Sequence, residues 1–506
     1  MNLELQNLKI SGYHAILNTN ITHEETMEAI VPDACPDILR IVETEGTVCM
    51  KGKDSFAGRA EFSGAATVTV LYCPEGEESL RRLEVKIPFR CGLDVPDLTP
   101  ECRYIVKPWV RAADTRILNP RKVLARVDLL LCVRAFGPSE ECYCTGFTEC
   151  AGVQQLEETH RAAVITAVKE KPFTFSEDLS FPSGSPAAEE LLRHRVALSC
   201  NEAKVIGNKL ILKGEAILRL SYRSTAGALC GCRWALPFSQ IMEIPGVEEE
   251  ADCTVTPILT GCSVELAMDT NGEARSVAVT LDVTAQAVVR EERTIKLISD
   301  AYSTESPLDI THAQGKLTHC GEEKLREVSL RETLEVPQAV RAIEDCSVTL
   351  VQSEFTAAAE TGTFASESAV TVLYRGEDNA VYSVTRRLPA GFDVSVSAGE
   401  RCNHRCRCSE AQAVPTVGGI EVRYSLLFSY QMIAQEQITV VTGAEPGELV
   451  AREGEQPSLI LRVIQGERLW DLAKGYRTTV AEIMAVNALE QPEAPTGTLL
   501  LIPQKR

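Results

Sequence analysis

Apolar and polar residues alternate along most of this chain with a period of two, the pattern of β-strands that bury one face. In segment 64–72, for example, valines at every second position precede Tyr72 on one face of the predicted strand. Short runs rich in turn-forming residues, such as 74–76 and 376–379, separate the alternating segments. The pattern therefore predicts a mainly β protein whose strands are joined by tight turns.

The same strand pattern occurs three times, in segments 64–72, 214–222 and 366–374. Each segment ends in a tyrosine, and the three tyrosines lie 150 and 152 residues apart. Further markers recur in nearly the same register, and these are leading prolines (Pro32 and Pro36, Pro182 and Pro186, Pro337), a Pro-Phe segment (Pro88 and Phe89, Pro237 and Phe238, Pro389 and Phe392) and a late alternating strand (127–133, 277–283, 420–428). Repetition at this spacing indicates three copies of one domain rather than a solenoid, whose units are roughly 20–50 residues long.

The three copies are predicted to span residues 1–150, 151–300 and 301–440. Because about 150 residues can bury a core of their own, we expect a multidomain chain with three tandem β-sandwich or barrel-like repeats. One short helix is expected after the leading prolines, at 36–40 in the first copy and at 187–195 in the second.

The pattern changes after the third copy. Residues 441–458 are rich in Gly, Pro and Glu without periodicity, which predicts a flexible acidic linker. Residues 459–503 then have the pattern of strand, helix, helix and strand, with a turn at Gly466 and a capping box from Thr479 to Glu482. The sequence thus predicts a small βααβ domain at 459–503.

The composition of the chain restricts the kinds of partner that these domains can bind. The chain has 506 residues, is 44% hydrophobic and carries a formal charge of -20, from 51 Lys and Arg against 71 Asp and Glu. So acidic a chain is unsuited to wrapping nucleic acid or lying on an anionic membrane, and basic partner surfaces suit it better.

Cysteine usage and the absence of targeting patterns indicate the compartment. No apolar run approaches the ~18 residues of a membrane span, and residues 1–10 lack the basic and apolar regions of a signal peptide. We therefore expect a cytoplasmic protein without a membrane span, whose 19 cysteines are free thiols and mostly buried.

The repeated unit resembles the SPOCS domain of clostridial sporulation proteins. Three features carry the resemblance: the proline-rich lead, the alternating strand that ends in tyrosine, and the Pro-Phe segment. The segment after the third copy strengthens the resemblance.

Residues 459–503 resemble a LysM domain. The family's opening pattern is matched by Val463, Gly466, Leu469, Trp470 and Ala473, its middle by Tyr476, Ile483 and Asn487, and its end by Gly497, Leu500, Ile502 and Pro503. The resemblance implies a shallow groove between two loops, and its lining residues are Gln465, Gly466, Glu467, Arg468, Leu469, Trp470, Asn487, Leu489 and Gly497.

One departure from the family pattern bears on what this groove binds. LysM domains usually bind glycans that contain N-acetylglucosamine, and the family commonly has Asp-Thr where this chain has Glu467 and Arg468. A long cation at this place favours protein–protein contacts. The departure therefore favours a protein partner without excluding a glycan.

SPOCS-like repeats followed by a LysM-like domain form the architecture of SipL-like spore coat morphogenetic proteins. The resemblance implies a non-catalytic scaffold in the mother-cell cytosol, at the forespore surface. It also implies that the LysM domain binds the coat basal-layer ATPase of the SpoIVA type, with other coat proteins as further partners. The alternative is a protein that binds peptidoglycan of the spore cortex or cell wall through the same groove.

One cluster could supply soft metal ligands, and its members are Cys402, His404, Cys406 and Cys408. Their spacing differs from the paired knuckles of zinc sites, and Cys402 falls in register with Cys102 and Cys253 of the other copies. We therefore predict a core position for Cys402 rather than a metal site. The pairs Cys142 with Cys144 and Cys230 with Cys232 place both thiols on one side of an extended chain, where redox pairing is the alternative to simple packing.

The sequence contains no motif that carries catalysis or binds a cofactor. It lacks a phosphate-binding GxxxxGK[ST] loop, a GxGxxG turn after a strand and a GxSxG elbow, and none of its seven histidines lies in an HExxH pattern. We therefore expect no catalytic residue and no cofactor.

Overall fold

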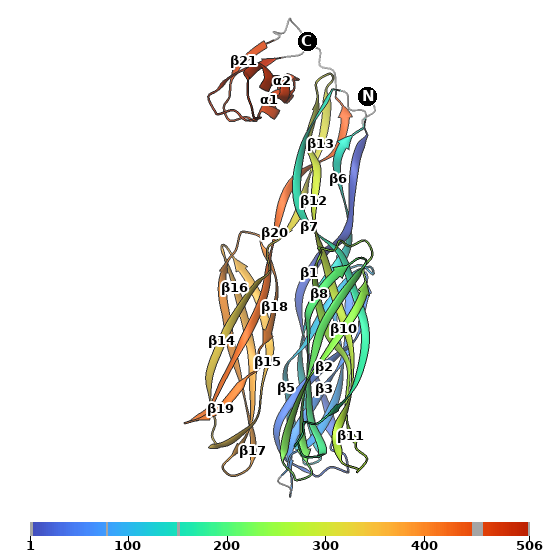
Figure 1. Ribbon diagram of the computed structural model, residues 1–506, viewed down its shortest axis with the longest axis vertical. Helices are drawn as coiled ribbons and strands as arrows, with labels where there is room; N and C mark the ends of the chain where they lie inside the picture. The colour runs from blue at the N-terminus through green and yellow to red at the C-terminus, as the bar shows by residue number, and fades with distance from the viewer. Residues whose placement is uncertain (1–3, 77–78, 149–151, 448–458, 504–506) are drawn as a thin grey trace.

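Long antiparallel strands dominate the computed structural model, which describes residues 4–76, 79–148, 152–447 and 459–503. Figure 1 shows strand bundles side by side, long strands that continue from them into a common stalk, and a small module beside the far end of that stalk. The prediction of a mainly β, multidomain protein is therefore confirmed.

The strands before residue 448 form three sets, which we call the first, second and third copy. The first copy consists of β1 (Leu5–Ile30), β2 (Ile38–Phe56), β3 (Arg59–Pro74), β4 (Arg81–Asp94), β5 (Arg103–Asn119) and β6 (Lys122–Phe147). The second consists of β7 (Val153–Ser180), β8 (Ala188–Ile206), β9 (Lys209–Ser224), β10 (Leu229–Glu243), β11 (Asp252–Met268) and β12 (Ala274–Ser303). The third consists of β13 (Leu308–Cys320), β14 (Lys324–Glu335), β15 (Val340–Ala358), β16 (Thr361–Gly376), β17 (Val381–Ser395), β18 (Arg401–Cys408), β19 (Gln412–Thr416) and β20 (Gly419–Pro446). The last described elements are β21 (Leu459–Val463), α1 (Leu469–Tyr476), α2 (Val480–Asn487) and β22 (Leu499–Pro503).

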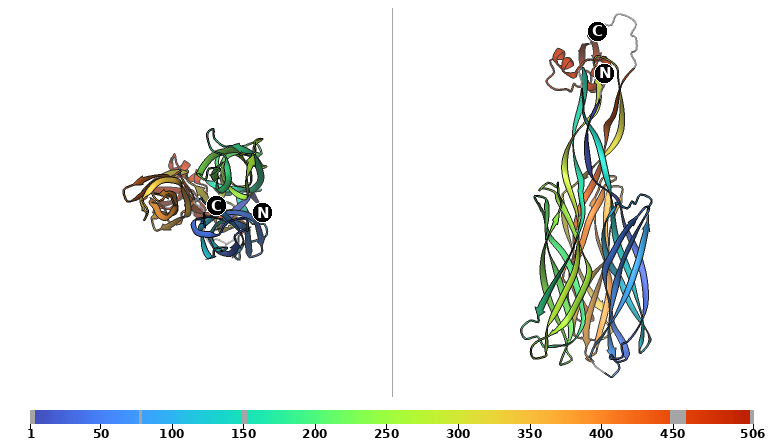
Figure 2. Two further views of the ribbon diagram at one scale, coloured as in Figure 1. Left: turned by 90° about the horizontal axis from the view of Figure 1, so that it is seen from below. Right: turned by 90° about the vertical axis from the view of Figure 1, so that its right-hand side faces the viewer.

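Each copy is built from two layers of antiparallel strands around a core of its own. In the first copy, β2, β3 and β4 form one layer, and β1, β6 and β5 form the other. The second copy repeats this with β8, β9 and β10 against β7, β12 and β11, and the third with β15, β16 and β17 against β14, β20, β18 and β19. Buried apolar clusters fill each copy. Figure 2 (left) shows the copies as rounded bundles around a common centre, so the repeats are tandem in sequence but side by side in space.

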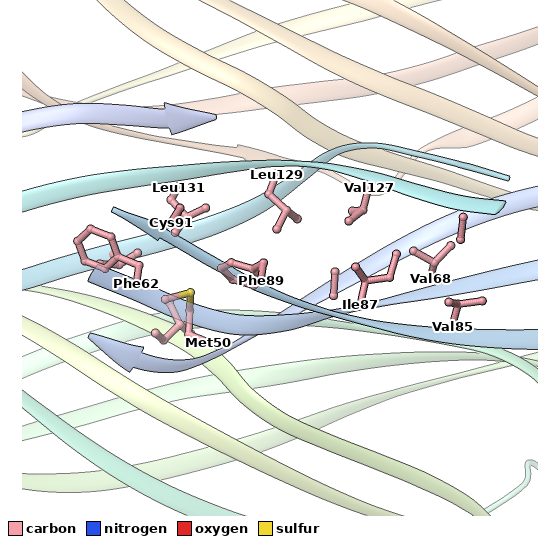
Figure 3. Packing of buried hydrophobic residues seen from close by; sticks show 14 of the residues in the cluster. Met50, Phe62, Val68, Val85, Ile87, Phe89, Cys91, Val127, Leu129 and Leu131 are labelled. Atoms are coloured by element: carbon pink, nitrogen blue, oxygen red, sulfur yellow. The ribbon is translucent and has the colours of Figure 1, made fainter. Parts of the chain in front are cut away.

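The core of the first copy shows how the alternating pattern becomes packing. Figure 3 shows side chains of β2, β3 and β4 pointing toward those of β6. Phe62, Val68 and Leu129 are all completely buried there. Along β3 every second side chain is buried, as the period of two in the sequence predicts.

The repeated tyrosines occupy one structural position. Tyr72, Tyr222 and Tyr374 are almost completely buried. Each hydroxyl donates a hydrogen bond to a group 36 residues earlier, and the acceptors are the carbonyl of Pro36 (3.3 Å), the carbonyl of Pro186 (3.0 Å) and the side chain of Gln338 (2.9 Å). A buried phenol needs such a partner, so the tyrosine fixes the proline-rich lead against the strand layer in every copy.

The Pro-Phe segment covers a glycine in two of the copies. A Cβ built on Gly64 would lie 2.7 Å from the ring of Phe89, and one built on Gly214 would lie 2.5 Å from the ring of Phe238. In the third copy a serine replaces the glycine, and the ring of Phe392, two residues further along, stacks on Phe364 instead. The inserted residues therefore move the aromatic ring to another site on the same strand.

The short helices predicted after the leading prolines are wrong. β2 starts at Ile38 and β8 at Ala188, so both segments are strands. These strands and β15 each carry three β-bulges, and the first two follow residues 38 and 41, 188 and 191, and 340 and 343. Because a bulge adds one residue to a strand, apolar side chains recur at spacings of three and four, as they do on a helix.

The late strands differ in register from the predicted alignment. In the first copy the amide of Val31 donates a hydrogen bond to the carbonyl of Arg121. The corresponding hydrogen bond in the second copy runs from the amide of Phe181 to the carbonyl of Arg275. β12 is therefore displaced by four residues relative to the predicted match of 127–133 with 277–283, because the turn before β12 is longer than the turn before β6.

The predicted boundaries meet the strands at different places. The boundary at 150 lies outside the described residues, and the boundary at 300 falls inside β12. β20 continues to Pro446, so 441–446 of the predicted linker form strand, whereas 448–458 lie outside the described residues.

The long strands of all three copies continue into the stalk (Figure 2, right). Its apolar core combines Ile10 and Tyr143 of the first copy with Leu297 of the second and Leu317 and Val440 of the third. The copies are therefore tied together at the stalk as well as along their flanks.

A buried cluster of charges joins the three copies at their common centre. Glu43, Arg193 and Asp345 follow the second bulge of β2, β8 and β15, and so occupy equivalent positions. Arg193 contacts Glu43 at 2.5 Å and also pairs with Asp345, while Arg195 pairs with Glu45, with Asp345 at 3.0 Å and with Glu43 at 3.3 Å. Burial raises the pKa of Glu43, and the two arginines oppose that rise. Equivalent positions thus carry a glutamate, an arginine and an aspartate, so the ion pairs form only between different copies.

Candidate functional site

The terminal module, residues 459–503, has the predicted order of strand, helix, helix and strand. β21 and β22 pair antiparallel, from Leu459 opposite Pro503 to Val463 opposite Leu499. The capping box is formed: the Glu482 amide donates to Thr479 Oγ1 at 3.0 Å, and the Thr479 amide donates to Glu482 Oε2 at 3.1 Å. The inner faces of these elements enclose an apolar core.

The two loops of the predicted groove lie side by side. The amide of Gly497 donates to the carbonyl of Ile464 at 2.8 Å, and the amide of Ile464 donates to the carbonyl of Thr498 at 3.0 Å. Gly466 and Gly497 both have positive φ, at 102° and 93°, which explains why the turns contain glycine. The structure thus brings together the two segments that the sequence predicted as neighbours.

The charged side chains of the predicted groove already have partners within the module. Glu467 accepts hydrogen bonds from the Gln465 amide (2.7 Å) and from Arg462 (2.6 Å), and these bonds hold the pKa of Glu467 below its usual range. Arg468 pairs with Asp471 at 3.2 Å. These bonds engage the side chains of Glu467 and Arg468, whereas the side chain of Gln465 is exposed.

Asn487 has a structural role. Its amide nitrogen donates to the carbonyls of Ile483 (2.8 Å) and Leu501 (2.7 Å), and its oxygen accepts from the Leu501 amide (2.8 Å). The side chain therefore joins α2 to β22. Leu469 is buried in the module core, and Leu489 packs against that core.

Trp470 lies at the contact between the module and the tip of the stalk. Its ring meets Tyr302 of β12 edge-on with the centroids 4.8 Å apart, and its Nε1 donates to Asp300 at 2.8 Å. Lys474 also pairs with Asp300, at 2.7 Å, and the Tyr302 hydroxyl donates to the carbonyl of Thr478 at 2.8 Å. Trp470 is thus used within the chain, to hold the module on the stalk.

Asp300 is the charged centre of this contact. Burial works against its ionised form, but hydrogen bonds from Lys474 and Trp470 and the charge of Lys474 prevail, and they lower its pKa below the usual value of 3.8. The contact is therefore complete at neutral pH.

The outer face of the β21–β22 sheet is a surface that sequence reasoning missed. Leu459, Leu461, Val463 and Leu499 are 48%, 59%, 47% and 54% exposed, and the cross-strand pairing places them together. A two-stranded sheet packed on two helices needs an apolar inner face, yet here the outer face is apolar as well. The alternation of Leu, Leu and Val with inward-facing residues on β21 is the signal that could have identified it. We call these four residues the outer face.

The candidate metal ligands do not form a compact site. Cys402, His404, Cys406 and Cys408 lie at every second position of β18, so neighbours on that face are about 7 Å apart along the strand. Cys406 is buried, and His404 meets the ring of Phe364 edge-on. Within the described part of the chain, no group of three or more His, Cys, Asp and Glu side chains is placed to hold a metal ion.

The predicted repeat register holds for two of the three cysteines. Cys253 and Cys402 directly follow equivalent residues, since Asp252 pairs with Arg290 and Arg401 pairs with Ile433. In the first copy Arg103 pairs with Phe136, so the equivalent residue is Tyr104, and the prediction is wrong for Cys102, which lies two residues earlier. All three cysteines pack against the core of their copy. The described cysteines carry free thiols, and burial raises the pKa of Cys253 and Cys402 to about 12. Cys142 is exposed and Cys144 buried, whereas Cys230 is partly buried and Cys232 buried.

Comparison with known proteins agrees with the repeat. Residues 37–118 and 187–267 match the family model described as SipL, SPOCS domain. The matched segments correspond to β2–β5 and β8–β11, the equivalent parts of the first and second copies. The match supports a SipL-like family and suggests a sporulation-related coat protein that interacts with other coat proteins.

No curated protein and no solved structure shows a significant match to the chain. Neither α1 nor α2, the helices of the described residues, is long and apolar enough to span a membrane.

Proposed function

We propose that this chain is a non-catalytic scaffold of spore coat assembly. Its terminal module acts as a LysM domain that docks the chain, in the mother-cell cytosol, onto the SpoIVA-type basal-layer ATPase at the forespore surface. The SPOCS repeats bind further coat proteins. The observation that carries the proposal is the exposed outer face of a module attached to SPOCS-type repeats.

The chemistry of the module favours a protein partner over a glycan. Cores of protein interfaces are apolar and depleted in charge, which matches the outer face. Glycan recognition instead requires polar groups with free hydrogen-bonding capacity, and the side chains of Glu467 and Asn487 in the predicted groove are bonded to neighbours in the module. The observations thus favour the ATPase over peptidoglycan as the partner.

The position of the module suits docking to an assembled surface. The stalk carries the module away from the strand bundles of the three copies (Figure 1), so these bundles stay accessible when the module is bound. On a polymeric partner, several chains held side by side would raise the effective concentration of their repeats for weak contacts with coat proteins.

The proposal is tested by offering the full chain to two surfaces, the purified coat ATPase and insoluble peptidoglycan. We expect retention on the ATPase and none on peptidoglycan. The variant Leu461→Asp places a charge in the middle of the outer face and should abolish retention. Leu325→Asp, at a leucine that is 81% exposed on β14, is the matched control and should bind as the wild type. Retention on peptidoglycan together with indifference to the ATPase would contradict the proposal.

A further inference from the structure

A cavity of about 590 Å³ lies at the neck, where the three copies pass into the stalk. Its walls come from β1 and β6 of the first copy, β7 and β12 of the second, and β13, β18 and β20 of the third. Small-molecule sites in proteins typically have volumes of roughly 300–1,000 Å³. The neck cavity therefore has the size of a ligand site.

Equivalent irregularities of the three copies surround this cavity. Each long strand pair is interrupted at the neck. A bulge lies next to the pairing of Ala15 with Phe136 and next to that of Ile165 with Arg290. In the third copy, β13 ends where Cys320 pairs with Ile433. All six residues line the cavity. Phe136, Arg290 and Ile433 thus occupy one repeat position, which is apolar in two copies and cationic in the second.

Arg290 is a buried cation whose bonding is incomplete. The residue is 7% exposed, and its Nη1 is buried without a hydrogen-bond partner. The carboxylate of Asp252, itself 56% exposed, lies 4.0 Å from Nη1, beyond hydrogen-bonding distance. A buried guanidinium without a full set of hydrogen bonds is costly unless a further anion pairs with it. The equivalent residues of the other two copies, Phe136 and Ile433, are apolar, so packing alone does not require an arginine there.

A second arginine adds to the positive charge of the cavity. Arg134 donates to the neutral side chain of Asn403 at 2.8 Å, and within the described ranges no carboxylate forms an ion pair with it. Burial and the nearby charges of Arg290 and Arg405 lower the pKa of Arg134 to about 10. Lys316 and Arg401 also line the cavity, whereas Glu141 is its one acidic lining residue among those described. The charges therefore favour an anion.

The remaining wall is largely apolar. Ile10, Phe136, Ile295 and Leu317 are each at least nine-tenths buried and line the cavity. An inorganic anion alone would leave this surface uncovered, whereas a ligand with an apolar body would cover it.

We propose that the neck cavity binds a small molecule that combines a carboxylate with an apolar body. The carboxylate pairs with the guanidinium of Arg290, with Arg134 beside it, since guanidinium and carboxylate form strong charge-assisted hydrogen bonds. The apolar body packs against the isoleucine, leucine and phenylalanine side chains of the wall. A ligand held there contacts all three copies and therefore stabilises their arrangement at the neck.

The test uses the full chain and decanoate as the probe, in calorimetric titration. We expect one molecule bound per chain, and weaker binding of decan-1-ol and of inorganic phosphate by about tenfold or more, because each lacks one half of the proposed recognition. No binding of decanoate, or equal affinity for decan-1-ol or phosphate, would overturn the proposal without any variant having to fold.

Substitution then locates the site. Arg290→Met removes the charge and keeps an apolar side chain of similar length, so it should weaken decanoate binding by at least about tenfold. It should also leave the thermal midpoint of the ligand-free protein unchanged or higher, because an unpaired buried charge is gone. Arg331→Met, at an arginine that is 66% exposed on β14, is the control and should bind decanoate as the wild type. Decanoate binding by Arg290→Met at wild-type affinity would place the ligand elsewhere and contradict the assignment.

Discussion

The charge cluster at the common centre predicts a large effect of one substitution, Arg193→Met. Methionine keeps the apolar stem of the arginine and removes its guanidinium. Glu43, whose side chain is 6% exposed, then loses its partner at 2.5 Å and keeps only Arg195 at 3.3 Å. Asp345 loses one of its two arginine contacts as well.

The magnitude of the expected loss is set by this burial. Removing one member of a buried ion pair costs about 3–5 kcal/mol, because the remaining charge stays buried without compensation. A pair about 4 Å apart at an effective dielectric constant of about 20 interacts by about 4 kcal/mol, which agrees with that range. The loss should appear where the three copies meet, in β2, β8 and β15.

Hydrogen exchange of the backbone amides measures this loss locally. Opening of the centre by Arg193→Met should accelerate exchange in β2, β8 and β15 by roughly a hundredfold to a few thousandfold. Arg331, which is 66% exposed and pairs with Glu421, provides the control, since Arg331→Met should leave exchange in these strands unchanged. Glu43→Gln combined with Arg193→Met should cost less than the sum of the two single changes. An acceleration of less than about fivefold in Arg193→Met would refute the reasoning, because it would correspond to about 1 kcal/mol or less, the value of an exposed pair.

Four further predictions concern the contact between the terminal module and the stalk, the repeated glycine and the cysteines of β18. Asp300→Asn should weaken the contact of the terminal module with the stalk by about 1–2 kcal/mol, seen as faster exchange at Tyr302, because Lys474 loses its ion pair while partial exposure reduces its value. Because the pKa of Asp300 lies below its usual value of 3.8, the contact should be fully formed above pH 3.8. It should be lost as the pH falls through the lowered pKa of Asp300. Gly214→Ala should destabilise the second copy by about 1–3 kcal/mol in thermal unfolding, because the new methyl group meets the backbone carbonyl of Ser199 and, at 2.5 Å, the ring of Phe238. Gly231→Ala should have much less effect, because its nearest neighbour would be 3.7 Å away. A chelator should leave the thermal midpoint unchanged, because the side chains of 402–408 are too far apart to share an ion; a drop would show a metal site.

The strands and their threefold repetition could be predicted from the sequence because the period of two survives in each copy. The tyrosines at 72, 222 and 374 gave both the phase and the spacing, and all three are buried at one position. The helices expected at 36–40 and 187–195 failed because consecutive bulges produce the spacing of a helix. Periodicity alone does not separate these two cases.

The meeting of the copies could not be predicted from the pattern. The equivalent residues Glu43, Arg193 and Asp345 differ in charge and type, so comparison of the copies shows them as unrelated surface charges. Only the packing of three bundles around one centre turns them into a buried network.

The candidate site was predicted in part. The loops around Gly466 and Gly497 were correctly paired, because their positive φ values and the flanking strands follow from the local sequence. The hydrogen-bond partners of Trp470 and Asn487 were not predicted: Trp470 contacts a strand that lies 170 residues earlier in the chain, and Asn487 bonds to the backbone of its own module. Residue type and local spacing do not reveal such partners.

The most direct test of the proposed function is the affinity of the full chain for the polymerised coat ATPase, measured for the wild type, Leu461→Asp and Leu325→Asp. Complete burial of one leucine side chain is worth about 1.5–3 kcal/mol, so loss of the leucine at 461, which is 59% exposed in the free chain, together with burial of a new charge, should weaken binding at least about tenfold. Leu325→Asp should bind as the wild type. Equal affinity of all three proteins would contradict docking through the outer face, and absence of wild-type binding would contradict the proposed function itself.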